Sequence, residues 1–129
     1  MTLSKEECRE IIARRVAQEF SEGDVITLGI GLPTEVANHL PPHLHVVFQS
    51  ENGLLGVGHR DLAAGENPKI TNAGGIAVTT KTGAAFFDSQ LSFAMIRGGH
   101  VDATVLGALQ VDQQGNLAAP AQGIASEGA

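Results

Sequence analysis

The stretch Asp24-Val-Ile-Thr-Leu-Gly-Ile-Gly-Leu-Pro-Thr34 decides the fold class of this 129-residue chain. Its first seven residues form a short apolar run, rich in β-branched side chains, that is typical of a buried strand. Gly31-Leu32-Pro33 breaks the strand, and Pro33 falls near the first turn of a short helix expected over residues 34–40. A strand that leads through a tight turn into a helix indicates an α/β protein.

The N-terminal segment predicts an amphipathic helix. Ser4 and Glu7 have the spacing of a capping box, and Gly23 stands where the helix should stop. Cys8 is interpreted as a core residue, because it belongs to an apolar stripe made of Cys8, Ile11, Ile12, Val16 and Phe20.

Further elements continue the alternation along the chain. Residues 45–50 predict a strand, a weaker strand is expected near 76–79, and residues 102–111 predict another strand before a turn at 112–116. Asp88 is placed to cap a helix over residues 89–97. Together the elements predict an α/β fold with an open, mostly parallel sheet flanked by helices.

Composition narrows the classes of function. The formal net charge of −6 argues against a nucleic-acid partner, and the absence of Trp and Tyr argues against an aromatic-lined groove. No apolar run approaches 18 residues, so no membrane span is expected. A single cysteine excludes an internal disulfide and a multi-cysteine zinc site. The acidic, polar N-terminus is unlike a signal peptide, so we expect a cytoplasmic protein.

The segment Ser50-Glu51-Asn52-Gly53 is the first candidate site. Glu51 follows an apolar strand, and ligands of open α/β sheets bind beyond the carboxyl ends of strands. Gly53, Gly56 and Gly58 would allow a ligand to approach the backbone closely. A carboxylate here can act as nucleophile, general base or metal ligand, and a solvated turn glutamate is the simpler interpretation.

The turn Gly29-Ile30-Gly31-Leu32-Pro33-Thr34 is the second candidate site. Strand-to-helix turns bind anions through unpaired N–H groups, although a purely structural turn explains the pattern equally well. Thr34 replaces the third glycine of a dinucleotide-binding fingerprint. The histidines His39, His43 and His45 match no metal-binding pattern and are interpreted as surface-loop residues, so no metal site is expected.

Several of these motifs together resemble the β subunit of family I CoA-transferases, which act on acetate, acetoacetate or other 3-oxoacids. The resemblance is carried by the two candidate sites, by Gly56-Val-Gly58, by Phe87-Asp-Ser89 and by Ser92-Phe-Ala-Met-Ile-Arg-Gly-Gly-His-Val-Asp102. It continues through Thr104-Val-Leu-Gly-Ala-Leu-Gln-Val111 and Gly115-Asn-Leu-Ala118.

The resemblance implies a mechanism and a set of site residues. Glu51 would be the nucleophile that forms a covalent glutamyl-CoA thioester, with coenzyme A as substrate and no further cofactor. An α subunit, an acyl-CoA and a carboxylic acid would be its partners. The residues expected to bind CoA or stabilise an oxyanion are Gly29, Gly31, Asn52, Gly53, Gly56 and Gly58.

The chain departs from the family pattern at two places. His59 stands where the family commonly has proline, and the sequence diverges after Ala118. Residues 1–118 are therefore expected to be the N-terminal part of a β-subunit domain, and residues 119–129 a flexible tail outside the pattern. An incomplete sheet should expose apolar faces. A catalytically inactive assembly partner is the alternative function, and a sugar-phosphate isomerase-like domain is a third, supported by fold analogy alone.

Overall fold

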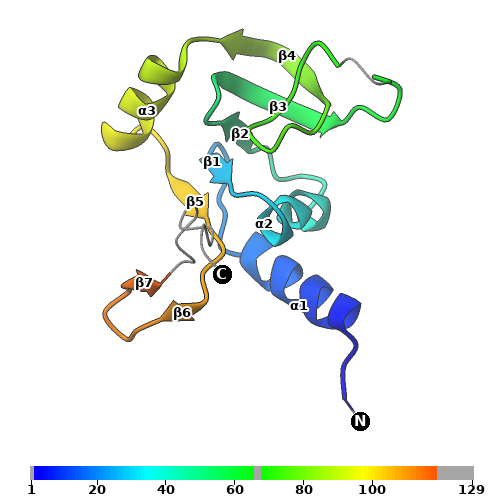
Figure 1. The fold of residues 1–129 in the computed structure, drawn as a ribbon, viewed down its shortest axis with the longest axis vertical. Helices are drawn as coiled ribbons and strands as arrows, with labels where there is room; N and C mark the ends of the chain where they lie inside the picture. The colour runs from blue at the N-terminus through cyan, green and yellow to red at the C-terminus, as the bar shows by residue number, and fades with distance from the viewer. Residues whose placement is uncertain (1, 66–67, 119–129) are drawn as a thin grey trace, which may run out of the picture.

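A five-stranded sheet with the strand order β4-β3-β2-β1-β5 forms the centre of the protein (Figure 1). The computed structural model describes residues 2–65 and 68–118. The strands are β1 Val25–Leu28, β2 Val47–Ser50, β3 Leu54–Arg60, β4 Val78–Phe86 and β5 Ala103–Val105.

The sheet is mixed, with most strands running in one direction. β1 is parallel to both β2 and β5, whereas β3 is antiparallel to β2 and to β4. Four of the five strands therefore point the same way, and β3 runs against them. The predicted α/β fold with an open, mostly parallel sheet is confirmed.

Helices lie on both faces of the sheet. The helix α1, Lys5–Ala17, packs with α2, Leu32–Glu35, and the 3₁₀ helix η1, Val36–His39, in a cluster that includes Leu28 of β1. The helix α3, Ser89–Arg97, instead contacts Gln49, which is paired in register with Thr27. Because successive side chains of a strand point to opposite faces, Thr27 and Leu28 place these helices on opposite sides.

The predicted N-terminal helix forms, but its buried face differs from the prediction. The capping box is present: the Glu7 N–H donates to Ser4 Oγ at 3.1 Å, and the Ser4 N–H donates to Glu7 Oε2 at 2.7 Å. The side chains of Ile11 and Ile12 are 54% and 48% exposed, and the buried residues are Ala13 and Ala17. The expected stripe was wrong at Ile11 and Ile12, because small alanine side chains form the close contact with η1, and Cys8 is only half-buried.

The downstream predictions need three corrections. The helix expected over 34–40 begins at Leu32 and continues as the 3₁₀ turn η1. The single strand expected over 102–111 is two strands, β5 and β6 Gln110–Val111, and β6 pairs with β7 Leu117–Ala118 in a separate hairpin around the predicted turn at 112–116. β3 and most of β4 were missed, because glycines at 56, 58 and 83 lower the strand propensity of these segments.

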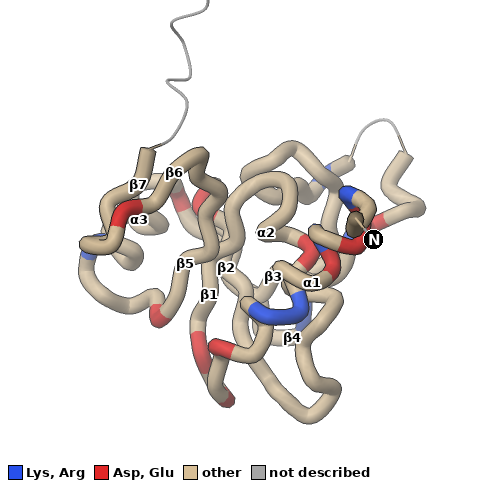
Figure 2. Tube along the Cα trace, turned by 90° about the horizontal axis from the view of Figure 1, so that it is seen from below, with Lys and Arg blue, Asp and Glu red and all other residues tan. Residues whose placement is uncertain are grey.

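Acidic and basic residues are interspersed on α1 and do not form separate acidic and basic faces. Figure 2 shows acidic and basic positions next to each other there, in agreement with the ion pairs Arg14–Glu10 and Arg15–Glu19. Within residues 2–65 and 68–118, no helix is both long and apolar enough to cross a membrane.

Several large apolar side chains are exposed near the end of the described chain. The β6–β7 hairpin stands apart from the five-stranded sheet in Figure 1. The side chains of Leu106, Leu109, Val111 and Leu117 are between 53% and 73% exposed. Exposed apolar side chains gathered in one segment promote association between molecules.

We therefore expect the chain, when purified alone, to self-associate. Light scattering coupled to gel filtration should give a mass above the 13.4 kDa of one chain. The fraction of protein in the associated form should grow with protein concentration. Substituting Leu109→Ser and Val111→Ser together should reduce the associated fraction. A monodisperse wild-type monomer with cooperative melting would contradict this expectation.

The carboxylate of Glu22 gives the fold a pH dependence. It accepts hydrogen bonds from the His45 backbone N–H at 2.8 Å and from His45 Nδ1 at 3.0 Å. These bonds lower the pKa of the Glu22 carboxyl group, and the backbone bond has the largest effect. Because the pKa is lower in the folded than in the unfolded protein, the ionised carboxylate stabilises the fold at pH values above the unfolded-state pKa of about 4.3. This stabilisation is lost as the pH falls through the folded-state pKa.

Replacing Glu22 with Gln should thus lower the melting temperature at pH 7, by at most a few degrees because the group is exposed. The difference from wild type should shrink as the pH is lowered below about 4. Thermal melts of both proteins at several pH values measure it, and an equal difference at pH 3 and pH 7 would contradict the assignment.

Candidate functional site

Glu51 opens a tight hairpin at the carboxyl end of β2. Ser50 pairs with Leu54 and Gln49 with Leu55, so Glu51, Asn52 and Gly53 form the loop between β2 and β3. The Gly53 N–H donates to the Ser50 carbonyl oxygen at 3.0 Å and closes the turn. Glu51 is exposed. The structure thus confirms that Glu51 lies beyond the carboxyl end of a parallel strand, the ligand-binding edge of such sheets.

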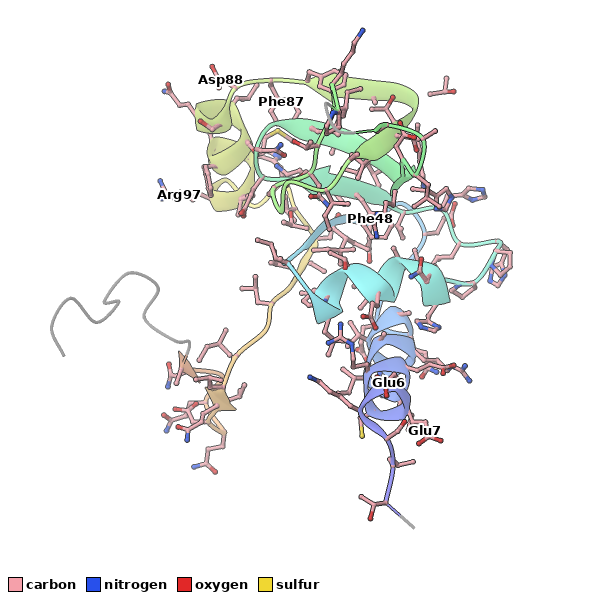
Figure 3. All side chains as sticks on the ribbon, turned by 45° about the vertical axis from the view of Figure 1, so that its right-hand side comes forward. Glu6, Glu7, Phe48, Phe87, Asp88 and Arg97 are labelled. Atoms are coloured by element: carbon pink, nitrogen blue, oxygen red, sulfur yellow. The ribbon has the colours of Figure 1, made fainter. Side chains whose placement is uncertain are left out.

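The hairpin is held from one side by the segment that precedes α3. The Phe87 N–H donates to the Gly53 carbonyl oxygen at 3.0 Å. Gly53 has a φ of +116°, and a Cβ atom at this position would collide with the Phe87 carbonyl oxygen. Only glycine allows both this backbone conformation and this close approach. Figure 3 shows Phe87 and Asp88 at the start of α3.

Two hydrogen bonds join the hairpin to the loop that contains Thr71 and Ala73. Asn52 Nδ2 donates to the Thr71 carbonyl oxygen at 2.8 Å, and the Ala73 N–H donates to Ser50 Oγ at 2.8 Å. Asn72 stabilises that loop from within, since its Oδ1 accepts from the N–H groups of Gly74 and Ile76. The Asn52 side chain therefore joins the turn that contains Glu51 to the loop over residues 71–76, called the 71–76 loop below.

A buried polar network fixes β2 from the α3 side. Thr27 Oγ1 donates to Gln49 Oε1 at 2.9 Å, and Gln49 Nε2 donates to Ser92 Oγ at 3.0 Å. All three side chains are buried, and a buried polar group is costly unless it is paired. The network ties β1, β2 and α3 together two residues before Glu51.

The turn after β1 approaches the same edge of the sheet. A Cβ atom built on Gly74 would lie 3.4 Å from Ile30, so the 71–76 loop lies between this turn and the hairpin. The Gly29 N–H donates to the Val105 carbonyl oxygen at 2.8 Å and is used within the fold. Gly31 has a φ of +84°, and among the described residues its N–H has no acceptor.

Gly56 and Gly58 lie inside β3, which shifts its register against β4 on both sides of Val57. A Cβ atom at Gly56 would lie 3.1 Å from the Ala84 Cα, and one at Gly58 would collide with Thr79 Oγ1. These glycines permit the close approach of two strands. Their role in binding CoA, like that of Gly29, Gly31, Asn52 and Gly53, stays a prediction.

The remaining candidate groups lie apart from the hairpin. His43 and His45 are exposed, as predicted for a surface loop, and His45 is paired with Glu22. The prediction is wrong for His39, which is the last residue of the 3₁₀ helix η1 and is half-buried. Within the described ranges, no three or more His, Cys, Asp or Glu side chains gather in a way that could hold a metal ion.

Sequence reasoning placed Glu51 and its glycines but missed the groups that hold them. Gln49 and the loop over residues 71–76 belong to no motif, and Ser92 was part of a family motif but was given no role at the site. Their contacts join segments 19 to 43 residues apart. The only available signal was the polar Gln49 inside an otherwise apolar strand. Such a residue needs a partner when it is buried.

The chain is similar over most of its length to subunits of known CoA-transferases. The chain is 56% identical to the beta subunit of the acetate CoA-transferase of Escherichia coli over 112 residues, which cover 87% of this chain and 50% of the relative. It is 52% identical to one subunit of the succinyl-CoA:3-ketoacid coenzyme A transferase of Helicobacter pylori over 110 residues, 85% of this chain and 53% of that one. The chain therefore spans about half the length of the curated relatives it matches.

A solved structure supports the fold. The chain superimposes on an acyl-CoA transferase from Escherichia coli with a TM-score of 0.57 and 26% identity, over 84% of this chain and 18% of that one. The profile of the family described as "Coenzyme A transferase" matches residues 9–127. This range reaches into residues 119–129, which lie outside the described residues, and their expected divergence from the family stays a prediction. On these matches and on the fold, the chain belongs to the coenzyme A transferase family.

Proposed function

We propose that this chain carries the nucleophile of an enzyme that transfers CoA from an acyl-CoA to a short-chain acid or 3-oxoacid. The observation that carries the proposal is the exposed Glu51 in a hairpin held by Phe87, Thr71 and Ala73. A covalent nucleophile has to be presented to the substrate in one orientation, because misplacement lowers the rate steeply. The contacts are made by Ser50, Asn52 and Gly53, and they hold the backbone of the turn from which the exposed Glu51 side chain projects.

The proposed reaction proceeds through two covalent states of Glu51. Its carboxylate oxygen attacks the thioester carbonyl carbon of the acyl-CoA and expels CoA as the thiolate, which leaves a mixed anhydride. The thiolate then attacks the glutamyl carbonyl carbon, releases the donor as a free carboxylate and forms the Glu51–CoA thioester. The acceptor acid reverses both steps. The scheme divides one difficult exchange into easier ones and needs no metal or redox cofactor.

Backbone donors near Glu51 would stabilise the oxyanion of each tetrahedral intermediate. The Gly29 and Gly53 N–H groups are engaged in the fold, whereas the Gly31 N–H has no acceptor among the described residues, so Gly31 is our candidate donor among these three glycines. A preorganised donor of this kind typically contributes a factor of about 10² to 10³ in rate. The rest of CoA would contribute binding energy that is used at the reacting carbon.

The partner in this proposal is a CoA-transferase α subunit. Relatives from Escherichia coli and Bacillus subtilis are named as beta subunits, which implies a second kind of subunit in those enzymes. The exposed apolar side chains near β6 and β7 would be available for assembly. The net charge of −6 argues against nucleic acid as a partner, and a cytoplasmic setting stays a prediction.

The decisive variant is Glu51→Gln, which removes the nucleophilic oxygen with little change in shape. After incubation of the αβ complex with acyl-CoA, intact-protein mass spectrometry should show covalently bound CoA on the wild type and none on the variant. Steady-state activity should fall by at least about 10⁴-fold.

Full activity of Glu51→Gln, or an adduct on another residue, would overturn the assignment of Glu51. A Glu6→Gln variant serves as the control, because Glu6 lies in the first turn of the distant α1. It should form the CoA adduct at the wild-type rate.

The close approach at Gly53 can be tested separately. Gly53→Ala should destabilise the protein by more than about 2 kcal/mol, because the Cβ atom collides with Phe87 and the backbone is in the left-handed region. Gly115→Ala is the matched control, with a φ of +84° and no atom within 4 Å of the added Cβ. It should cost only about 1 kcal/mol. Denaturant melts measure both, and equal losses would show that Phe87 does not restrain the hairpin.

A further inference from the structure

A cleft of about 310 Å³ lies between the sheet and the helical segment α2–η1, separate from the Glu51 carboxylate. Its apolar wall is formed by Leu28, Phe48, Val57, Ile76 and Val78. Figure 3 shows Phe48 between the sheet and α2. The volume lies at the lower end of the range of small-molecule sites, which are mostly apolar with a few convergent polar groups.

Two exposed cations lie at the cleft. Arg60 lines it where β3 ends, and Lys81, which is not itself a lining residue, has its Nζ 6.0 Å from the centre of the Phe48 ring in the cleft wall. Within residues 2–65 and 68–118, no carboxylate lies within 4.0 Å of the charged groups of Arg60 or Lys81. In a chain with a net charge of −6, two such cations beside one apolar cleft would attract an anion.

One acidic side chain also lines the cleft, and its charge is compensated. Glu35 Oε1 accepts from Arg9 Nε at 3.0 Å and forms an ion pair with the same guanidinium. Glu35 therefore adds little repulsion for a bound anion. The remaining polar lining comes from neutral groups, including Asn38 and Asn72.

We propose that this cleft binds a small carboxylate with an unbranched apolar tail. The carboxylate would be held by the Arg60 guanidinium, whose planar group matches two carboxylate oxygens, with Lys81 adding charge nearby. The tail would lie against Phe48, Val57 and Val78. Binding at this site does not depend on Glu51, which is not among the residues that line the cleft.

The cleft also reaches the base of the hairpin. Ser50 is buried, lines the cleft, and its Oγ accepts the hydrogen bond from the Ala73 N–H. A ligand in the cleft would therefore lie against the residue that precedes Glu51. Ligand binding should therefore change the NMR chemical shifts of the backbone amides in the 71–76 loop, which Ser50 contacts.

The test uses the full 129-residue chain and four probes: sodium hexanoate, butyrate and acetate, and the uncharged hexanol. Ligand-observed proton NMR reports binding even if the protein self-associates, and nitrogen-15 amide spectra of the chain locate it. Hexanoate should bind roughly tenfold more tightly than butyrate, because each buried methylene adds up to about a fourfold gain. Shifts should gather at Gly58, Asn72 and Ile76.

Arg60→Gln should weaken hexanoate binding about tenfold, as expected for the loss of a charge-assisted pair. Ile76→Phe, which fills the apolar wall without changing charge, should also weaken hexanoate binding. The control Arg97→Gln removes an arginine at the end of α3 and should leave binding unchanged.

Three results would overturn the proposal. Equal affinity for hexanoate and acetate would show that no tail is bound, and equal affinity for hexanoate and hexanol would show that the charge is not recognised. Equal weakening by Arg60→Gln and Arg97→Gln would place the ligand elsewhere. Because the readout is binding, failure here leaves the Glu51 proposal intact, and a Glu51→Gln chain should bind hexanoate normally.

Discussion

The close approach of the Gly53 and Phe87 backbones is the constraint on which the rest of the site depends. The Phe87 N–H donates to the Gly53 carbonyl oxygen, and there is no room for a Cβ atom between the two segments. This contact lets β3 turn directly back from β2 and brings the start of α3 beside the turn. Glu51 is thereby held at the edge of the sheet while its side chain stays exposed.

Polar contacts, rather than a large apolar core, organise the region around Glu51. The buried network Thr27–Gln49–Ser92 is complete, since each donor and acceptor that it uses has a partner. On the other side, Asn52 and Ser50 bind the 71–76 loop. A satisfied buried network specifies one arrangement strongly, because any other arrangement leaves polar groups unpaired. The hairpin is thus restrained on both faces of the sheet.

The elements that the sequence predicted well are those with local signals. The capping box at Ser4 and the cap at Asp88 mark the two longer helices, and their side chains make the expected hydrogen bonds. The apolar runs of β1 and β2 are equally local. β3 was missed because Gly56 and Gly58 are poor strand formers. They are accommodated only because β4 packs directly against them, which is a contact between segments about 20 to 30 residues apart.

Sequence by itself determined the α/β class, the family resemblance and the position of Glu51 after a buried strand. These follow from local periodicity, turn residues and motif spacing. Only the tertiary structure decided that Asn52 binds the 71–76 loop, that the Gly29 N–H is already engaged, and that Arg60 and Phe48 border one cleft. The physical reason is that hydrogen-bond partners and cleft walls come from distant segments, whose packing is set by the whole sheet.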